Sequence, residues 1–369
     1  MALFLLHRKS LCNKNAPRWR RAVPALLFAE RSKNGGDFVE EKIRDILEQY
    51  QFEVYHTYRG RGAFICETDQ GLKLIKEYDY SPSRLEFEIL MKYIIRDRGY
   101  YFIDQYVSNR EGEYLSKNKD GKAFVVKDWF EGKECDTKSL LDIGELSKNL
   151  ARLHKLMTDI HLEDKRVFAC VPESLSETME RHNQELVSIR NYIRGRKQKN
   201  EFDELFMDCY AILFAEGEES KKHLESSGYT DLLQQALDER RLCHGDYHQH
   251  NVLIYGERMA TVNFDKMNFS IQMDDLYLFL RKMMEKNQWS QEVGETIIRS
   301  YLSVKEITRQ EMEYLYIRLL YPEKWWKISN HYYNSRKSWT SKRNLEKLQV
   351  FIQNNENRKN FVASLLLYF

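Results

Sequence analysis

The sequence contains few residues that interrupt helices and no long apolar run. Only 5 of its 369 residues are proline and 16 are glycine, a composition that favours long helices joined by short loops. No apolar stretch approaches the roughly 20 residues that a membrane-spanning helix needs. The net charge is only +2, which argues against a protein that binds nucleic acid through its overall charge. We therefore expect a helix-rich protein with no membrane span and no nucleic-acid partner.

Cysteine is present but shows no pattern. The six cysteines are scattered along the chain, and no two of them form a Cys-x-x-Cys pair. This spacing offers no zinc site and is typical of proteins from a reducing compartment. Hydrophobic residues make up 42% of the chain and charged residues 31%. The chain is therefore globular and long enough for one large domain or two lobes.

Residues 1–36 differ from the rest of the chain and form a basic extension. A short apolar start is followed at once by His7-Arg8-Lys9, and residues 18–21 form a second basic cluster. The apolar run is too short for a signal peptide, and no small-residue cleavage site follows it. Two interpretations stay open: a basic anchor for a membrane or a coat layer, and a frayed extension or a start codon placed too early. We favour the second, because terminal tails are commonly disordered.

The most informative stretch is residues 244–265. It opens with His-Gly-Asp, ending at Asp246, and Asn251 follows five residues later. Two short apolar runs come next, separated by a turn at Gly256, and the second run leads to a polar cluster that ends at Asp265. This pattern predicts two short strands flanking a turn, with polar side chains at their ends.

These polar side chains are of the kinds that phosphoryl transfer needs. The reaction requires a group that positions the acceptor hydroxyl, and ligands for Mg²⁺, which neutralises the phosphate charge. Asp246 is placed to accept the proton of the acceptor, and Asn251 to bind Mg²⁺ through its amide oxygen. An acid after the second strand would bridge the metals. A lone His-Gly-Asp is a weak signal, but His-Gly-Asp-x4-Asn followed by strand, glycine and strand is fairly specific.

The stretch resembles the catalytic loop of the aminoglycoside phosphotransferase and choline kinase superfamily, which is similar to the protein kinases in fold. Further segments resemble one branch of it, the CotS family of spore coat proteins from endospore-forming bacteria. These segments are residues 58–66, 263–266, 275–282 and 321–328. The resemblance covers residues 40–360, which is most of the chain.

The resemblance implies a bilobal, protein-kinase-like α+β fold. Residues 37–130 would form an N-terminal lobe, with an antiparallel sheet and one helix. Residues 131–369 would form a mainly helical lobe that carries the catalytic-type loop. ATP would bind between the two lobes. Residues 173–240, which we expect to be helical, cover the region where related enzymes build the acceptor site.

The resemblance also implies a phosphate clamp. Lys76 follows an apolar pair in the third expected strand and resembles the lysine that holds the nucleotide phosphates. The helix expected over residues 83–95 should supply a glutamate that pairs with Lys76. Glu86 is our choice, and Glu88 is the alternative.

The remaining expected contacts lie at three places in the chain. The turn that contains Arg61 and Gly62 would cover the phosphates, unless it is an ordinary hairpin turn. Backbone groups around Trp129 would bind the adenine, unless the aromatic residues there belong only to the core. By resemblance, His244 and Asp275 would support the catalytic-type loop through hydrogen bonds.

The expected metal site departs from the family. Active members have Ile-Asp-Phe or Ile-Asp-Trp after the second strand, whereas this chain has Val-Asn-Phe with Asn263 at the central position. Asparagine is neutral, and Mg²⁺ favours carboxylate ligands. In an extended strand, Asp265 would point the same way as Asn263 and would be able to replace it. The candidate Mg²⁺ ligands are therefore Asn251, Asn263 and Asp265.

Two functions follow from these residues. The first is an ATP- and Mg²⁺-dependent phosphotransferase that acts during sporulation on a hydroxyl acceptor, which is a small molecule or a coat protein. The second is a catalytically degenerate kinase-like module that serves the spore coat by binding other coat proteins. Lys76, Asp246 and Asn251 favour the first function, and Asn263 favours the second. By resemblance, both imply synthesis in the cytoplasm and assembly into the spore coat.

Overall fold

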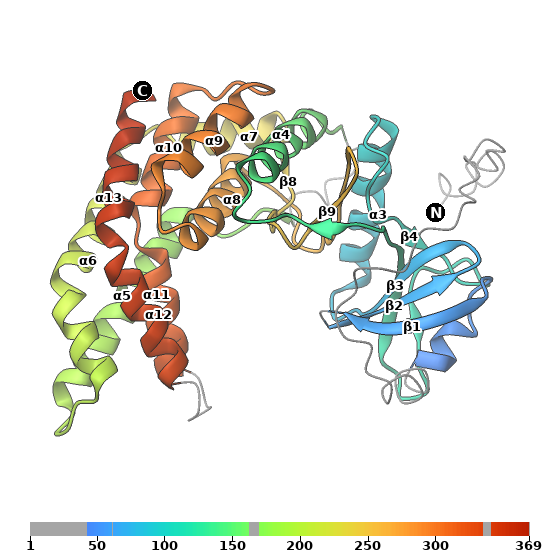
Figure 1. Cartoon of the computed structure of the whole chain (residues 1–369), viewed down its shortest axis with the longest axis horizontal. Helices are drawn as coiled ribbons and strands as arrows, with labels where there is room; N and C mark the ends of the chain where they lie inside the picture. The colour runs from blue at the N-terminus through green and yellow to red at the C-terminus, as the bar shows by residue number, and fades with distance from the viewer. Residues whose placement is uncertain (1–42, 61, 162–169, 335–340, 369) are drawn as a thin grey trace.

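The computed structural model describes residues 43–60, 62–161, 170–334 and 341–368. The predicted basic extension and Arg61 lie outside these residues. The described chain forms a β-sheet lobe and a larger helical lobe (Figure 1). This arrangement confirms the predicted α+β fold, with an N-terminal antiparallel sheet and a mainly helical C-terminal part. No helix among the described residues is both long enough and apolar enough to cross a membrane.

The N-terminal sheet has six antiparallel strands in the order β1-β2-β3-β6-β4, with β5 paired to β6. The strands are β1 (Val54–Gly60), β2 (Ala63–Thr68), β3 (Gly71–Glu77), β4 (Tyr106–Val107), β5 (Ser116–Lys117) and β6 (Ala123–Asp128). Strand β6 is buried over residues 124–127. A lysine, Lys127, is therefore enclosed at the middle of the sheet.

Helix α3 (Pro82–Asp97) lies between the sheet and the helical lobe (Figure 1). The hydroxyl of Ser81 caps its start by accepting a hydrogen bond from the backbone N–H of Arg84. Met91 on its inner face packs in one apolar cluster with Phe264 of the helical lobe. The helix thus connects the sheet to the segment that follows the catalytic-type loop.

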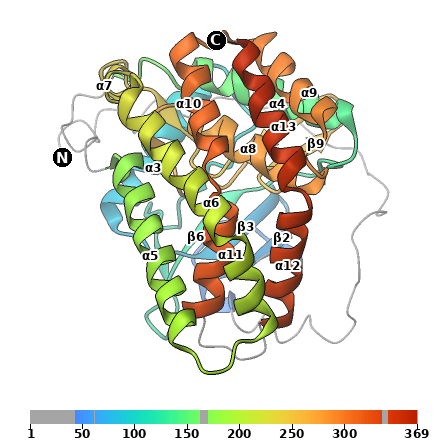
Figure 2. The same cartoon turned by 90° about the vertical axis from the view of Figure 1, so that its left-hand side faces the viewer.

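The helical lobe is organised around α8, which contacts α4, α9 and α10. Figure 2 shows the long helices α5 and α6 beside α11 and α12. Figure 1 shows that these helices lie at the end far from the sheet. The helices are α4 (Leu140–Leu156), α5 (Leu175–Gly195), α6 (Glu201–Ser226), α7 (Tyr229–Asp238), α8 (Met273–Lys286), α9 (Gln291–Leu302), α10 (Arg309–Leu320), α11 (Glu323–Asn334), α12 (Ser341–Gln353) and α13 (Asn355–Ser364). The expected helical character of residues 173–240 is confirmed by α5, α6 and α7.

Short strands frame the catalytic-type loop. The loop lies between β8 (Leu242–Cys243) and β9 (Val252–Tyr255), and β9 forms an antiparallel hairpin with β10 (Arg258–Thr261). Strand β8 pairs with β11 (Asn268–Phe269), and β7 (Lys133–Glu134) pairs with β9. The predicted pair of short strands around a glycine turn is confirmed.

Candidate functional site

The catalytic-type loop is held in place by Asp275 at the start of α8. Its two carboxylate oxygens accept hydrogen bonds from the backbone N–H groups of His244, at 2.6 Å, and Gly245, at 2.8 Å. His244 is itself buried, and its Nε2 lies 3.1 Å from the carbonyl oxygen of Val262. Burial lowers the pKa of His244, so the ring is neutral at pH 7 and serves as a hydrogen-bonding group.

Gly245 allows the loop to turn this tightly. Its φ angle is +78°, and a Cβ atom at this position would lie 2.0 Å from the carbonyl oxygen of Lys266. Any side chain would therefore push apart the loop and the segment that follows β10. The glycine of the His-Gly-Asp sequence is thus required by close packing.

Asp246, the predicted base, is surrounded by cationic and hydrogen-bonding groups. Lys266 Nζ lies 2.9 Å from Oδ2, and Lys282 Nζ lies 3.4 Å from Oδ1. His248 Nε2 also lies 3.3 Å from Oδ1. Burial by itself would raise the pKa of Asp246, but the contacts with His248, Lys266 and Lys282 outweigh it and hold the pKa well below the usual range. A carboxylate in this setting has little affinity for a proton, which weakens it as a general base.

The amide oxygen predicted for the metal belongs to Asn251, and it already has a partner. Asn263 Nδ2 donates to Asn251 Oδ1 at 2.9 Å, and Asn251 Nδ2 donates to the carbonyl oxygen of Asp246 at 2.8 Å. Asn263 adopts a left-handed φ of +63°, and its backbone N–H donates to Asp104 Oδ2 at 3.1 Å. The structure thus brings the two asparagines together.

We expected Asp265 to lie in an extended strand with Asn263, and this expectation is wrong. Strand β10 ends at Thr261, and the left-handed backbone of Asn263 turns the chain before Asp265. The carboxylate of Asp265 lies between two ammonium groups. Lys76 Nζ is 2.5 Å from Oδ2, and Lys127 Nζ is 2.6 Å from Oδ1.

The charge of Asp265 is therefore compensated from the N-terminal lobe. Burial would raise its pKa, but the positive charges of Lys127 and Lys76 outweigh burial and hold the pKa far below its usual range. Lys76, the predicted phosphate lysine, keeps 38% of its side chain exposed, whereas Lys127 keeps only 1%. Lys76 thus faces solvent in part, and Lys127 forms the closed end of the site.

Of the two candidate glutamates on α3, Glu88 is the buried one. Its carboxylate accepts hydrogen bonds from the Tyr106 hydroxyl and from Arg84 Nε, the latter at 3.0 Å. Burial raises the pKa of Glu88, because these partners do not fully replace water. Glu86 lies on the exposed face of the helix. The structure therefore places Glu88 close to the expected site.

The two remaining predicted contacts lie at the sheet. Gly62 has a φ of +81° in the turn between β1 and β2, and no atom lies within 4 Å of the position its Cβ would take. Trp129 is half-buried, and its backbone N–H donates to the carbonyl oxygen of Leu72 at 2.9 Å. This N–H group is thus used by the sheet.

Several charged residues at the site were not predicted. A buried ion pair joins Lys92 of α3 to Asp104, with 2.9 Å between Nζ and Oδ1, and both side chains are fully buried. Lys127 Nζ also lies 3.6 Å from Asp104 Oδ2. Arg84 Nη2 donates to the backbone carbonyl oxygens of Asp265, at 2.9 Å, and Met267, at 2.6 Å. One signal was available: Lys127 interrupts an otherwise apolar strand sequence, Phe-Val-Val-Lys.

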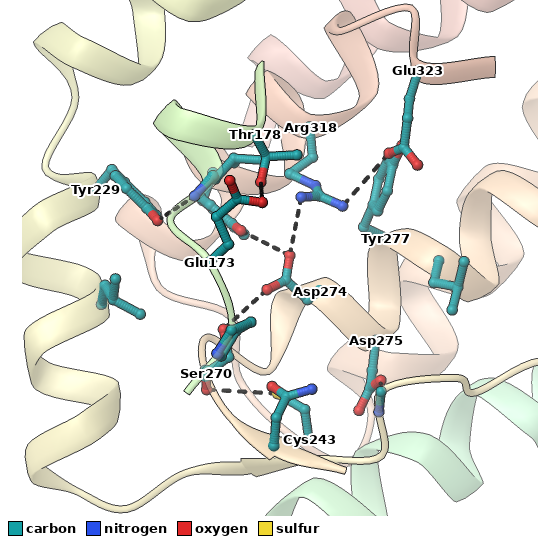
Figure 3. A pocket seen from close by; sticks show the side chains of 17 residues that line it. Glu173, Thr178, Tyr229, Cys243, Ser270, Asp274, Asp275, Tyr277, Arg318 and Glu323 are labelled. Atoms are coloured by element: carbon teal, nitrogen blue, oxygen red, sulfur yellow. Dashed lines mark hydrogen bonds and ion pairs between the residues drawn. The ribbon is translucent and has the colours of Figure 1, made fainter. Parts of the chain in front are cut away.

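A separate cavity of about 220 Å³ lies on the helical side of the loop and includes Gly245 in its lining (Figure 3). Arg318 lines this cavity. Its Nη1 lies 3.5 Å from Asp274 Oδ1, and its Nη2 lies 3.7 Å from Glu323 Oε2. The hydroxyl of Tyr314 donates to Asp274 at 2.7 Å. Asp274, Arg318 and Glu323 thus form a chain of ion pairs along the cavity, and neither Asp246 nor Asp265 lines it.

The fold and the loop define the class of protein. An aminoglycoside phosphotransferase from Alicyclobacillus acidocaldarius has the same fold, with a TM-score of 0.77 and 16% identity over 87% of this chain and 94% of that one. Spectinomycin phosphotransferase APH(9)-Ia, solved with ADP and spectinomycin, gives a TM-score of 0.63 and 16% identity over 89% of this chain and 98% of that one. The chain therefore has the aminoglycoside phosphotransferase fold.

Within that class, the sequence points to one family. The family model described as "Spore coat putative kinase YutH" matches residues 43–365, and the chain belongs to this family of spore coat proteins. Spore coat protein S of Bacillus subtilis (strain 168) is 22% identical over 341 residues, which are 88% of this chain and 94% of that protein. The resemblance to CotS proteins drawn from the sequence is confirmed.

Proposed function

We propose that this protein is a spore coat component whose kinase-like cleft binds nucleotide but does not transfer its phosphoryl group. The observation that carries this proposal is the environment of Asp246. Three groups that can carry positive charge, on Lys266, Lys282 and His248, contact its carboxylate. A carboxylate surrounded by these groups has a low affinity for the proton of an acceptor hydroxyl. General-base catalysis is most efficient when the pKa of the base lies near the working pH.

The retained parts of the cleft support binding. Lys76 is partly exposed at the end of β3, where a nucleotide phosphate can reach its ammonium group. ADP is bound in the APH(9)-Ia complex, and GDP is bound in an aminoglycoside 2′-phosphotransferase complex, so related folds hold nucleotides. On this proposal the chain acts in the coat through nucleotide-dependent contacts with other coat proteins.

The alternative function is phosphotransfer to a hydroxyl acceptor, and it is favoured by the joint presence of Lys76, Asp246 and Asn251. Incubation of the full chain with γ-labelled ATP, Mg²⁺ and either spore coat extract or a panel of small hydroxyl compounds separates the two functions. We expect no label transfer above that of the Asp246→Asn variant. Transfer that the wild-type chain performs and this variant does not would establish the alternative.

Nucleotide binding is tested by thermal unfolding with ADP. Ligand at a hundredfold excess over its dissociation constant stabilises the fold by about 2.7 kcal/mol. We expect this stabilisation in the wild-type chain and its loss in Lys76→Met. The control is Lys122→Met, because Lys122 is exposed and pairs with Glu77 away from the loop. Equal stabilisation of all three proteins would contradict binding at Lys76.

A further inference from the structure

The group that the fold leads one to expect at this site is Mg²⁺, and the residues present do not fit it. Magnesium requires near-octahedral oxygen ligation and is bound in such sites through one or two carboxylates. The amide oxygen of Asn251 accepts a hydrogen bond from Asn263, and each oxygen of Asp265 is within 2.6 Å of an ammonium nitrogen. Among the described residues, no group of three or more His, Cys, Asp or Glu side chains is placed to hold a metal ion.

The net charge of the residues around Asp265 also disfavours Mg²⁺ at this site. The ion pairs connect Lys76, Lys92 and Lys127 to Asp104 and Asp265, so the network holds three positive and two negative groups. We call these five residues the lysine centre. A divalent cation beside Asp265 would lie close to two ammonium groups in a largely buried setting, where like charges repel strongly. The centre therefore repels a metal ion from the carboxylate expected to bind it.

Lys127 is fixed at this place by its surroundings. Its side chain is almost fully buried in β6, its ammonium group lies between Asp265 and Asp104, and it contacts the ring of Tyr106 at 4.8 Å from the centroid. Burial opposes its charge, but the two carboxylates raise the pKa of Lys127 above the ordinary value. The ammonium group is thus a positive charge held in place inside the site.

We infer that the lysine centre binds the phosphates of metal-free nucleotide, with Lys127 supplying the positive charge that Mg²⁺ supplies in a kinase. The excess positive charge of the centre and the partly exposed ammonium group of Lys76 both favour an anion. Free ADP carries more negative charge than its Mg²⁺ complex, so the free form has the stronger attraction. This inference rests on the proposed nucleotide binding and adds the ionic form of the ligand.

The test is calorimetric titration of the full wild-type chain with ADP, once in EDTA and once in millimolar Mg²⁺. We expect binding that is several-fold tighter in EDTA. Binding that is tighter in Mg²⁺, or that requires it, would overturn the inference while leaving nucleotide binding intact. Absence of binding in both buffers would overturn the inference together with the proposed binding function. The wild-type measurement decides the matter without any variant.

The variant Lys127→Met tests whether Lys127 causes the preference for metal-free ADP. Lys127→Met removes the ammonium group but keeps much of the side-chain length, and it leaves Asp265 and Asp104 with less positive charge between them. We expect weaker binding of metal-free ADP and a gain of Mn²⁺ binding, measured by the loss of the free Mn²⁺ signal in electron paramagnetic resonance. Lys122→Met, at an exposed lysine just before the same strand, should behave as wild type. Mn²⁺ binding by the wild-type chain at equal strength would contradict the role given to Lys127.

Discussion

The side chains of Asn263 and Asn251 are joined by a hydrogen bond of 2.9 Å from Nδ2 to Oδ1. In the related active enzymes, position 263 is expected to hold an aspartate, and an aspartate cannot donate this bond. At the position where the family resemblance led us to expect a metal ligand, the asparagine thus makes a direct contact within the protein. The contact links the end of the loop to the segment that follows β10.

We predict that Asn263→Asp destabilises the chain by about 1–2 kcal/mol, because a carboxylate oxygen would face Asn251 Oδ1 without a hydrogen between them. Denaturant unfolding in the absence of metal measures this effect. The matched control is Asn268→Asp, because Asn268 donates only an exposed bond to the carbonyl oxygen of Lys266 and should cost less than about 0.5 kcal/mol. Equal losses would show that the bond between the asparagines carries no stability.

Two glycines with positive φ angles should respond differently to alanine. Gly245→Ala places a Cβ atom 2.0 Å from a backbone carbonyl oxygen, whereas at Gly256, with φ +58°, no atom lies within 4 Å of the added Cβ. We expect Gly256→Ala to cost about 1 kcal/mol from backbone strain alone. Gly245→Ala should cost at least about 3 kcal/mol, since the loop must move away. Similar unfolding free energies for the two variants would contradict the close packing.

Asp275 accepts two backbone hydrogen bonds in a buried setting, so its replacement should be costly. Asp275→Asn retains one accepting oxygen and turns an NH₂ group toward the other backbone N–H. We expect a loss of roughly 2–4 kcal/mol in the free energy of unfolding. Asp238→Asn is the control, because Asp238 accepts an exposed bond from Gln234 at the end of α7. A loss no larger than that of the control would remove Asp275 as the support of the loop.

The stability of the helical lobe should fall in mild acid because of His182. This ring is stacked on Trp326, with centroids 3.3 Å apart, and burial lowers its pKa to about 4. The histidine of the unfolded chain has a pKa near 6.5. Between pH 6.5 and 4 the unfolded chain therefore binds a proton at this residue, and the folded chain does not. Stability is complete above pH 6.5 and falls as the pH drops toward 4, by roughly 3 kcal/mol. Below the folded pKa the loss is complete.

The change His182→Phe keeps an aromatic ring against Trp326 and removes the proton. We expect a weaker dependence of the melting temperature on pH between 6.5 and 4 than in the wild-type chain. Both proteins are compared in the same buffers by calorimetry. Parallel curves in the two proteins would contradict the assignment to His182.

The loop was predictable because its signals are local. The spacing from Asp246 to Asn251, the turn at Gly256 and the two apolar runs lie within one stretch of sequence, and each gave the element that the structure has. The break after β10 was not predictable in this way. The left-handed backbone of Asn263 depends on partners such as Asp104, which lies 159 positions away in sequence.

The lysine centre was missed for a physical reason. Sequence patterns assign lysines to the surface, since burial of an ammonium group is costly unless a distant carboxylate pairs with it. Lys127 pairs with Asp265, which lies 138 positions away in the sequence. A local hydrophobic pattern cannot predict such a distant contact. The burial of Glu88 was predictable from helical spacing, because Leu85, Glu88 and Lys92 share one face of α3 and all three are buried.

Arg84 has a consequence for how the protein unfolds. It extends from α3 and donates to the carbonyl oxygens of Asp265 and Met267, while Lys76 and Lys127 hold the Asp265 carboxylate from the sheet. Separating the lobes exposes several charges at once and breaks bonds on both sides. The slowest amides in the sheet and in the helical lobe should therefore exchange with deuterium through the same global opening, so that a bilobal chain behaves as one cooperative unit.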